Sequence, residues 1–256
     1  MLHLVESRLP PRAALLDIAC GSGALALPAV RRALRERERT GVASTIVATD
    51  FSPKMVEHTR QAAAALGADE AIIRCEVHNG EALALADASF DAAFSSFGIF
   101  LFSDRRAGWR EAARVLRPGG TFVTSVWQGP AHNPMLRHQM GPILAALPPH
   151  LIPSNKGGWI EISEAEALIA EVTTSAPLHS ARCYPFHATL AISNWREYWD
   201  AMRDNPVMGA LLQQCSPTEL SAVHARVSQH LRELAGGEEE PLLLDSVCNI
   251  LVATRS

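Results

Sequence analysis

The stretch LLDIACGSG at residues 15–23 decides the fold that the sequence predicts. It begins within a short apolar run, Ala13–Ala19, and ends in a turn that carries two glycines. The residues that follow, Ala24 to Arg39, have a helical composition. Glycines between a strand and a helix allow a sharp turn and let a ligand approach the backbone closely. The stretch therefore predicts a strand, a helix and a turn that either binds a ligand or is only a turn.

The same alternation continues outward as far as residue 127. Helices are expected from Ser52-Pro53, where a hydroxyl precedes a proline, and over Asp104 to Leu116. Five predicted strands alternate with helices, which indicates an α/β fold with a mostly parallel sheet and helices on both faces. Pro28 follows Gly23 closely, so the first helix either starts later than Gly23 or bends at the proline. The other four strands are expected at Ser44–Thr49, Ala71–Val77, Phe90–Ser96 and Thr121–Trp127.

The second half of the chain has a different pattern. Residues 128–153 carry six of the sixteen prolines, Pro153 being the last of them, which predicts a broken helical insertion after the fifth strand. Hydroxyl residues that suit helix N-termini predict later helices at Ser163-x-x-Glu166 (to about Val172), at Ser193 and at Ser216-Pro217. Two further strands are expected at His179–Ala191 and Leu242–Ala253. We expect one α/β domain with a helical insertion.

Composition narrows the class of protein. The 256 residues carry a net charge of −4, which argues against a nucleic-acid-binding surface spread over the whole chain. The five cysteines are odd in number and form no C-x-x-C pair, so they fit neither a disulfide framework nor a zinc site and indicate a reducing compartment. No apolar run approaches the ~18–20 residues of a membrane helix, and the N-terminus lacks the order of a signal peptide. We expect a soluble, cytoplasmic protein.

Asp17 separates two classes of ligand. Gly21-x-Gly23-x-x-Ala26 fits the dinucleotide fingerprint loosely, which would favour a nicotinamide oxidoreductase. A carboxylate close to that turn would repel a pyrophosphate but attract an ammonium or a sulfonium group. S-adenosylmethionine carries both of these groups together with an adenosine. Asp17 therefore favours S-adenosylmethionine over a dinucleotide.

A second acid, Asp50, ends the second predicted strand, 27 residues after Gly23. In a nucleotide-binding sheet, an acid at this place accepts hydrogen bonds from the ribose hydroxyls. Alternatively, Asp50 only supplies negative charge near the N-terminus of the next helix. Phe51 and Met55 follow it, and they either line an adenine or belong to the core.

Four segments, in order, resemble the motifs of class I S-adenosylmethionine-dependent methyltransferases. The closest resemblance is to the ubiquinone/menaquinone-biosynthesis-type branch (methyltransferase type 11) and its small-molecule relatives. It covers about residues 10–127 and implies a Rossmann-like, seven-stranded sheet whose last strand is antiparallel. We accordingly expect a cofactor-binding core at 10–127, a helical substrate insertion or lid at 128–180, and strands and helices at 181–256 that complete the sheet. The segments are LLDIACGSG (15–23), IVATDFSPKMVEHTR (46–60), HNGEALALADASFDAAFSS (78–96) and REAARVLRPGGTFVTSVW (110–127).

The resemblance also implies roles for individual residues. The first motif would surround the methionine part of the cofactor, Asp50 would hold the ribose, and Phe51 and Met55 would lie near the adenine. Where the family usually has an acid that accepts from the adenine amine, this chain has Asn79, whose amide oxygen accepts the same bond without charge assistance. The residues expected to bind the cofactor are Asp17, Ala19, Gly21, Gly23, Asp50, Phe51, Met55, Asn79, Gly80, Ser95 and Ser96.

Methyl transfer from a sulfonium is a direct displacement with a neutral leaving group, so the protein mainly supplies alignment and no metal ion is required. A base is needed only when the acceptor must lose a proton. Histidine suits that role, and His132 is preferred because it follows the fifth strand closely. Residues expected to contact the acceptor are Phe97, Trp127 and His138. Other candidates for a base are His150, His179, His187, Tyr184 and Glu161.

Three functions stay open. The leading hypothesis is methyl transfer to a small, apolar or aromatic organic acceptor, with no nucleic-acid partner and no membrane span. The second is an S-adenosylmethionine-binding protein without turnover, acting as a partner subunit or sensor; the short segment before the first strand and the scattered base candidates leave room for it. The third is an NAD(P)-dependent oxidoreductase. The sequence determines neither the acceptor atom nor the oligomeric state, and a homodimer is one of the states left open.

Overall fold

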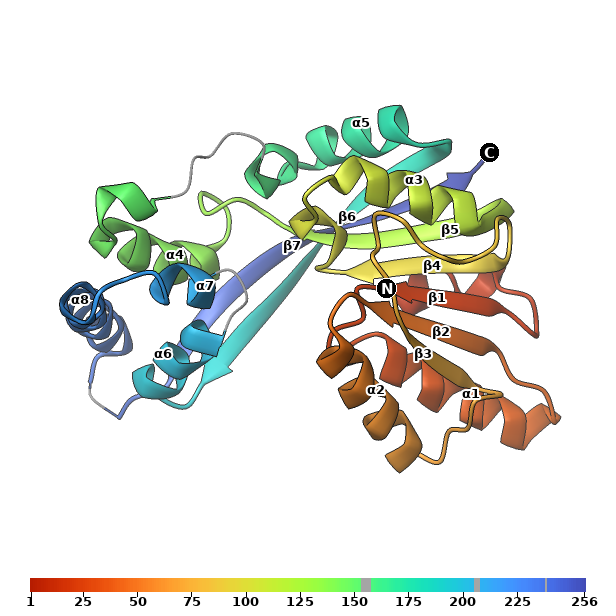
Figure 1. The fold of residues 1–256 in the computed structure, drawn as a ribbon, viewed down its shortest axis with the longest axis horizontal. Coiled ribbons are helices and arrows are strands. Elements are labelled where there is room, and N and C mark those ends of the chain that lie inside the picture. Colours follow the sequence, from red (N-terminus) through yellow and green to blue (C-terminus); the bar gives the residue numbers. More distant parts are fainter. Residues whose placement is uncertain (153–157, 205–207, 238) are drawn as a thin grey trace. The chain divides into compact units, whose positions relative to one another are not determined.

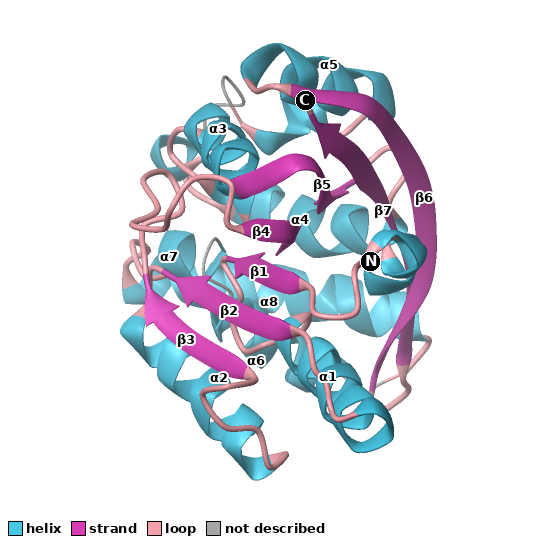
Figure 2. Cartoon of the chain, turned by 90° about the vertical axis from the view of Figure 1, so that its right-hand side faces the viewer, coloured by secondary structure: helices cyan, strands magenta, loops and turns pink. Residues whose placement is uncertain are grey.

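The computed structural model describes residues 1–152, 158–204, 208–237 and 239–256. In this part of the chain, a seven-stranded sheet has the order β3-β2-β1-β4-β5-β7-β6, and Figure 2 shows its first five strands side by side. These five strands pair in parallel, whereas the last strands are antiparallel, which confirms the predicted Rossmann-like fold. The strands are β1 (Ala14–Ile18), β2 (Thr45–Asp50), β3 (Ile73–Val77), β4 (Phe90–Ser96), β5 (Leu116–Trp127), β6 (Leu178–Ile192) and β7 (Leu242–Arg255).

Helices pack along the parallel strands. In Figure 1, α1 and α2 lie beside β1–β3, α3 lies along β4 and β5, and α5 packs against α3. No helix in the described residues is long and apolar enough to cross a bilayer. The α-helices are α1 (Ala26–Thr40), α2 (Pro53–Ala65), α3 (Arg105–Val115), α4 (Pro134–Ala146), α5 (Ala165–Ser175), α6 (Trp195–Asp204), α7 (Met208–Leu212) and α8 (Pro217–Ala235). Short 3-10 helices are η1 (Leu2–Leu4), η2 (Glu6–Arg8), η3 (Ile99–Leu101), η4 (Pro149–Leu151) and η5 (Trp159–Ile162).

The central strand β1 explains where a site forms. Leu15, Leu16 and Ile18 are buried, as expected for a strand covered on both faces in a parallel sheet. Asp17 is in register with Ala48 of β2 and Phe94 of β4. The carboxyl ends of these parallel strands therefore meet at one edge of the sheet, which is where open α/β sheets bind ligands.

The described chain divides into two compact units. Unit 1 comprises Met1–Trp127, Glu161–Pro185 and Asn249–Ser256, and unit 2 comprises Gln128–Ile160 and Phe186–Cys248. Unit 1 contains β1–β5 with α1, α2, α3 and α5, whereas unit 2 contains α4, α6, α7 and α8. The division into a core, an insertion and a C-terminal part stays a prediction.

Two local features follow from backbone chemistry. Helix α1 begins at Ala26, later than Gly23, so Pro28 lies in its first turn, where the missing N–H would have no intrahelical partner. The stretch 117–120, between the predicted helix that ends at Leu116 and the predicted strand that begins at Thr121, lies inside β5. Pairing with β4 jumps from Leu116 to Thr121 and leaves the stretch as a bulge, in which Gly119 has a φ of +79°.

The N-terminal caps of the helices test where the sequence predicted each helix to begin. Ser52 caps α2, and Ser216 opens α8 with a complete capping box, both as predicted. The prediction for Ser163 is wrong: α5 begins after Glu164, and the Ser163 carbonyl instead accepts a hydrogen bond from the buried Asn249 side chain at 2.8 Å. At α6, the capping side chain is that of Asn194, one residue after Ser193, and it accepts from the Arg196 and Glu197 N–H groups. Pro153, the end of the predicted insertion, lies outside the described residues.

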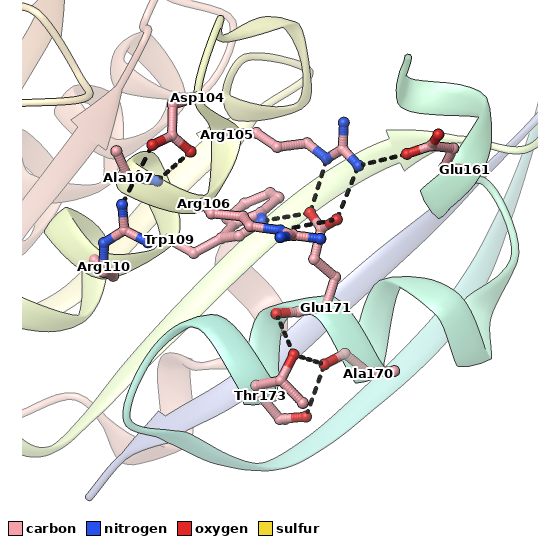
Figure 3. Close-up of polar contacts among 11 residues, drawn as sticks. Asp104, Arg105, Arg106, Ala107, Trp109, Arg110, Glu161, Ala170, Glu171 and Thr173 are labelled. Atoms are coloured by element: carbon pink, nitrogen blue, oxygen red, sulfur yellow. Dashed lines mark hydrogen bonds and ion pairs between the residues drawn. The ribbon is translucent and has the colours of Figure 1, made fainter. Parts of the chain in front are cut away.

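A buried ion pair joins α3 to α5 (Figure 3). Glu171 accepts from Arg105 Nε at 2.7 Å and from Arg105 Nη2 at 2.8 Å, and its Oε1 also accepts from Trp109 Nε1 at 3.0 Å. Glu161 adds a further contact to Arg105 at 3.2 Å. Burial acts to raise the pKa of Glu171, but the hydrogen bonds from Arg105 and Trp109 outweigh it and hold that pKa below its ordinary value. This network therefore fixes α5 on α3 within unit 1.

Candidate functional site

The turn after β1 has the left-handed backbone conformation that its two glycines favour. Gly21 and Gly23 have φ values of +53° and +89°, in the left-handed region that favours glycine. Ala19 adopts the same region at +57°, and a non-glycine residue held there stores strain. A Cβ on Gly23 would lie 2.8 Å from Cγ of Leu27, so α1 also approaches this turn too closely for a side chain.

Asp17 lies at the end of β1 with its side chain 1% exposed. Among the described residues, neither of its carboxylate oxygens has a hydrogen-bond donor. Burial raises the pKa of Asp17 to about 7. The nearby Ala26 N–H, which does not reach hydrogen-bond geometry with either oxygen, offsets part of this, and the charge of Asp50 adds to it. A buried carboxylate without a partner destabilises a fold unless a cation or a donor meets it. The structure therefore presents an unsatisfied acid beside the glycine turn.

Asp50 ties the second strand to the same turn. Its Oδ2 accepts from the Gly21 N–H and its Oδ1 from the Ser52 N–H, both at 2.9 Å. A carboxylate offers about four lone-pair sites, so these two bonds leave capacity for two further donors. Asp50 thus both shapes the turn and can accept from a ligand.

A cavity of about 430 Å³ opens at this edge of the sheet. Its size is within the range of small-molecule sites. Phe51 is 77% exposed, so its ring offers an uncovered aromatic face. The cavity brings together the predicted residues Ala19, Asp50, Phe51, Asn79 and Gly80, and its lining also includes His78, Glu81, Leu101, Phe102 and Ser103.

The polar side chains of this cavity are already arranged by the fold. His78 accepts from the Ala84 N–H through Nδ1 at 3.2 Å, so its proton lies on Nε2, which faces Glu76 at 3.0 Å. The Asn79 side-chain oxygen accepts from the Glu81 N–H at 3.0 Å and keeps a second lone pair. The wall is therefore preformed.

Sequence reasoning missed the segment Leu101–Ser103 of this wall. A Cβ on Gly80 would overlap the Phe102 ring, and one on Gly108 of α3 would lie 2.8 Å from the same ring. The two glycines thus make room for Phe102. The signal available in the sequence was position alone, because this segment follows the fourth strand and must emerge at the same sheet edge as Asp50.

The lining of this cavity does not include the other predicted residues. Met55 lies in the first turn of α2 and donates its N–H to the Ser52 hydroxyl. Ser95 is fully buried, and its hydroxyl accepts from the Ile99 N–H at 3.1 Å. Ser96 is half-buried at the end of β4. Phe97 stacks on Trp127 with ring centroids 4.0 Å apart.

Comparison with known proteins agrees with this geometry. Residues 16–124 match the family described as a methyltransferase domain. Nocamycin O-methyltransferase from Saccharothrix syringae is 32% identical over 195 residues, 76% of this chain and 60% of that protein. Demethylmenaquinone methyltransferase from Deinococcus radiodurans is 38% identical over 116 residues, 45% of this chain and 44% of that protein.

The YcgJ protein from Bacillus subtilis has a solved structure with the same fold. It has a TM-score of 0.60 at 17% identity, and the match covers 99% of this chain and 96% of that one. Residues 16–124 form a class I S-adenosylmethionine-dependent methyltransferase domain. The chain spans only 44% and 60% of the lengths of the two curated relatives.

The methyltransferase domain fits the cofactor of its family, S-adenosylmethionine. The unsatisfied Asp17 carboxylate would be met by the cofactor's ammonium group, and a cation there would remove the burial penalty. Asp50 keeps acceptor capacity beside the cavity, and the exposed Phe51 ring offers a stacking surface. Asp17 favours S-adenosylmethionine over a dinucleotide, because a pyrophosphate would leave the Asp17 carboxylate without a partner and would be repelled by its charge.

The two predicted histidines belong to unit 2. His132 is exposed in the segment before α4. His138 on α4 faces His230 on α8, with Nδ1 and Nε2 3.2 Å apart, and burial followed by the His230 and Arg137 charges lowers the pKa of His138. The described residues contain no cluster of three or more His, Cys, Asp or Glu side chains that suits a metal ion.

Proposed function

We propose that this chain transfers a methyl group from S-adenosylmethionine to a small, apolar or aromatic organic acceptor. The observation that carries the proposal is the buried, unpartnered carboxylate of Asp17 beside the glycine turn. A small acceptor is supported by the names of the two curated relatives, which refer to nocamycin and to demethylmenaquinone.

Different residues would bind different parts of the cofactor. Asp17 and the turn through Gly23 would hold the amino-acid part, Asp50 the ribose hydroxyls, and Phe51 a face of the adenine. When bound, the cofactor supplies an electrophilic methyl carbon on a sulfonium. The chain would then contribute alignment, because bringing two reactants into a reactive geometry accounts for roughly 7–11 kcal/mol of a barrier.

Phe97 and Trp127 would provide the acceptor surface. Phe97 directly follows β4 and Trp127 ends β5. The two rings stack on each other and are half-buried, so they offer an apolar wall at this edge of the sheet. Ser95 and Ser96 on the same strand end would face the transferred methyl. A base would be needed only for an acceptor that loses a proton, and for it we propose His132, with His138 as an acceptor contact. A cytoplasmic location, a homodimer and the absence of a nucleic-acid partner stay predictions.

Calorimetric titration tests the ligand directly. We expect micromolar binding of S-adenosylmethionine and S-adenosylhomocysteine and none of NADH. Binding of NADH without either sulfur nucleoside would support the oxidoreductase alternative and overturn the proposal. Asp50→Ala should abolish binding, because it removes both the ribose acceptor and the anchor of Gly21. Glu239→Gln, which changes an exposed acid of unit 2, is the matched control and should bind normally.

Turnover separates an enzyme from a binding protein. The wild-type chain should transfer labelled methyl groups from S-adenosylmethionine to at least one member of a panel of phenols, quinols, amines and thiols. Tight cofactor binding without any product across the panel would favour the alternative of a partner subunit or sensor.

A further inference from the structure

Both backbone polar groups of Gly21 are hydrogen-bonded to side chains. Its N–H donates to Asp50 at 2.9 Å, and its carbonyl accepts from the hydroxyl of Thr59 at 2.8 Å. Thr59 lies in the second turn of α2, its side chain is 0% exposed, and it does not line the cavity. The second anchor therefore comes from a residue outside the site described above.

Thr59 contacts the second glycine of the turn as well. A Cβ on Gly23 would lie 3.3 Å from Cγ2 of Thr59, so the threonine methyl packs against the Gly23 backbone. The Sγ of Cys20 also approaches the Gly21 carbonyl, at 3.7 Å. One side chain thus holds Gly21 through its hydroxyl and packs on Gly23 through its methyl.

Such anchoring matters most at glycine. Gly21 has a φ of +53°, and a Cβ built there meets nothing within 4 Å, so packing alone does not fix this residue. Fixing the backbone of one residue costs conformational entropy. If hydrogen bonds meet that cost during folding, the ligand does not have to meet it on binding.

We propose that Thr59 is a positioning residue for the cofactor turn. Its hydroxyl holds the Gly21 carbonyl toward α2, so that the N–H of the same residue stays on Asp50. The turn that would hold the amino-acid part and the acid that would hold the ribose are thereby kept in one arrangement before the ligand arrives. This inference rests on the proposed function.

Two substitutions at Thr59 separate its hydroxyl from its shape. Thr59→Val keeps the methyl and the branching but removes the donor, and Thr59→Ser keeps the donor. We expect Thr59→Val to raise the Kd of S-adenosylhomocysteine about tenfold, the effect of losing one hydrogen bond, and Thr59→Ser to stay within about threefold of wild type. An equal loss in both variants would overturn the proposal, because packing would then explain it.

A matched control variant distinguishes a specific effect on binding from general destabilisation of the fold. Ser246 of β7 is buried and donates to the Ala188 carbonyl of β6 at 3.0 Å, so Ser246→Ala loses the hydrogen bond of a buried hydroxyl in unit 2, away from the turn. Thr59→Val and Ser246→Ala should lower the Tm similarly, but only Thr59→Val should weaken binding. Equal weakening in Ser246→Ala would count against Thr59.

Hydrogen exchange of the ligand-free protein gives a readout that needs no turnover. The peptide spanning residues 17–25 should exchange faster in Thr59→Val than in wild type or Ser246→Ala. Unchanged exchange together with unchanged affinity would overturn the role of Thr59 alone. Failure of the wild-type chain to bind S-adenosylhomocysteine would instead overturn the proposed function, and exchange would still decide whether Thr59 orders the turn.

Discussion

At the scale of single residues, ionisation of Asp17 has opposite effects on the stability of the fold and on the binding of a cationic ligand. Its carboxyl is buried without a partner among the described residues, and its pKa is raised to about 7. Folding therefore favours the protonated form, whereas a cationic ligand requires the carboxylate. Two predictions follow from this conflict, one for binding and one for stability.

Cofactor affinity should increase with pH across the titration of Asp17. Below a pKa of about 7 the acid is protonated and offers no charge to the ligand's ammonium, and above it the carboxylate is available. We expect the Kd of S-adenosylhomocysteine to fall by roughly tenfold between about pH 6 and 8. Calorimetry over this range measures the effect. Asp17→Asn should bind weakly with a flat profile, and a steep profile in that variant would assign the titration to another group.

Stability of the ligand-free protein should change in the opposite direction. Because the folded-state pKa of Asp17 lies above its ordinary value of 3.8, the stabilisation it brings is complete below about pH 4 and is lost as the pH rises through about 7. Above pH 7, Asp17→Asn avoids burying a charge. It should raise the Tm of the ligand-free chain by roughly 2–4 °C, and scanning calorimetry at pH 6 and pH 8 tests this. At pH 8, a Tm of Asp17→Asn below that of the wild-type chain would contradict this explanation.

At the scale of elements, the attachment of α5 to α3 depends on one charge network. Arg105 and Glu171 make a two-pronged ion pair at 2.7 and 2.8 Å, and Trp109 donates to the same carboxylate (Figure 3). Breaking a buried pair leaves an uncompensated charge, which is more damaging than losing an exposed pair. This element contact should therefore be sensitive to single substitutions.

Glu171→Gln should destabilise the protein by about 3 kcal/mol. The amide keeps the shape of the side chain but leaves the Arg105 guanidinium with the more exposed Glu161 in place of its two-pronged counter-charge. Glu239→Gln removes an acid from the exposed pair with Arg196 and should cost less than about 1 kcal/mol. Urea unfolding of both variants gives the comparison. Because the pKa of Glu171 is held below its ordinary value, this stabilisation is present above pH 4.5 and is lost as the pH falls below it.

At the scale of the whole molecule, ligand binding should be visible as stabilisation. A ligand present at about 100 times its Kd adds roughly 2.7 kcal/mol to the free energy of unfolding. For a chain of this size, we expect S-adenosylhomocysteine to raise the Tm by roughly 5–10 °C. Differential scanning fluorimetry should detect no rise with NADH and none for Asp50→Ala with either ligand. A similar rise with NADH would contradict the charge argument built on Asp17.

The sequence by itself determined the features that depend on neighbours along the chain. β1, the glycine turn and α1 follow one another within a few residues, so an apolar run, two glycines and a helical composition were enough to predict them. The same holds for Ser52 and Ser216, whose hydroxyls cap the helices that they precede. Strand alternation also predicted the parallel sheet, because parallel neighbours require crossovers.

Only the tertiary structure decided which distant side chains meet. Thr59 reaches the Gly21 carbonyl, and Phe102 fills the space above Gly80, because packing of α2 and of the segment after β4 brings them there. Neither contact has a local pattern in the sequence. Asn249 likewise donates to the Ser163 carbonyl from 86 residues away. Hydrogen bonds and side-chain overlap act over a few ångströms, so they are fixed by the folded arrangement and leave no periodic trace in the sequence.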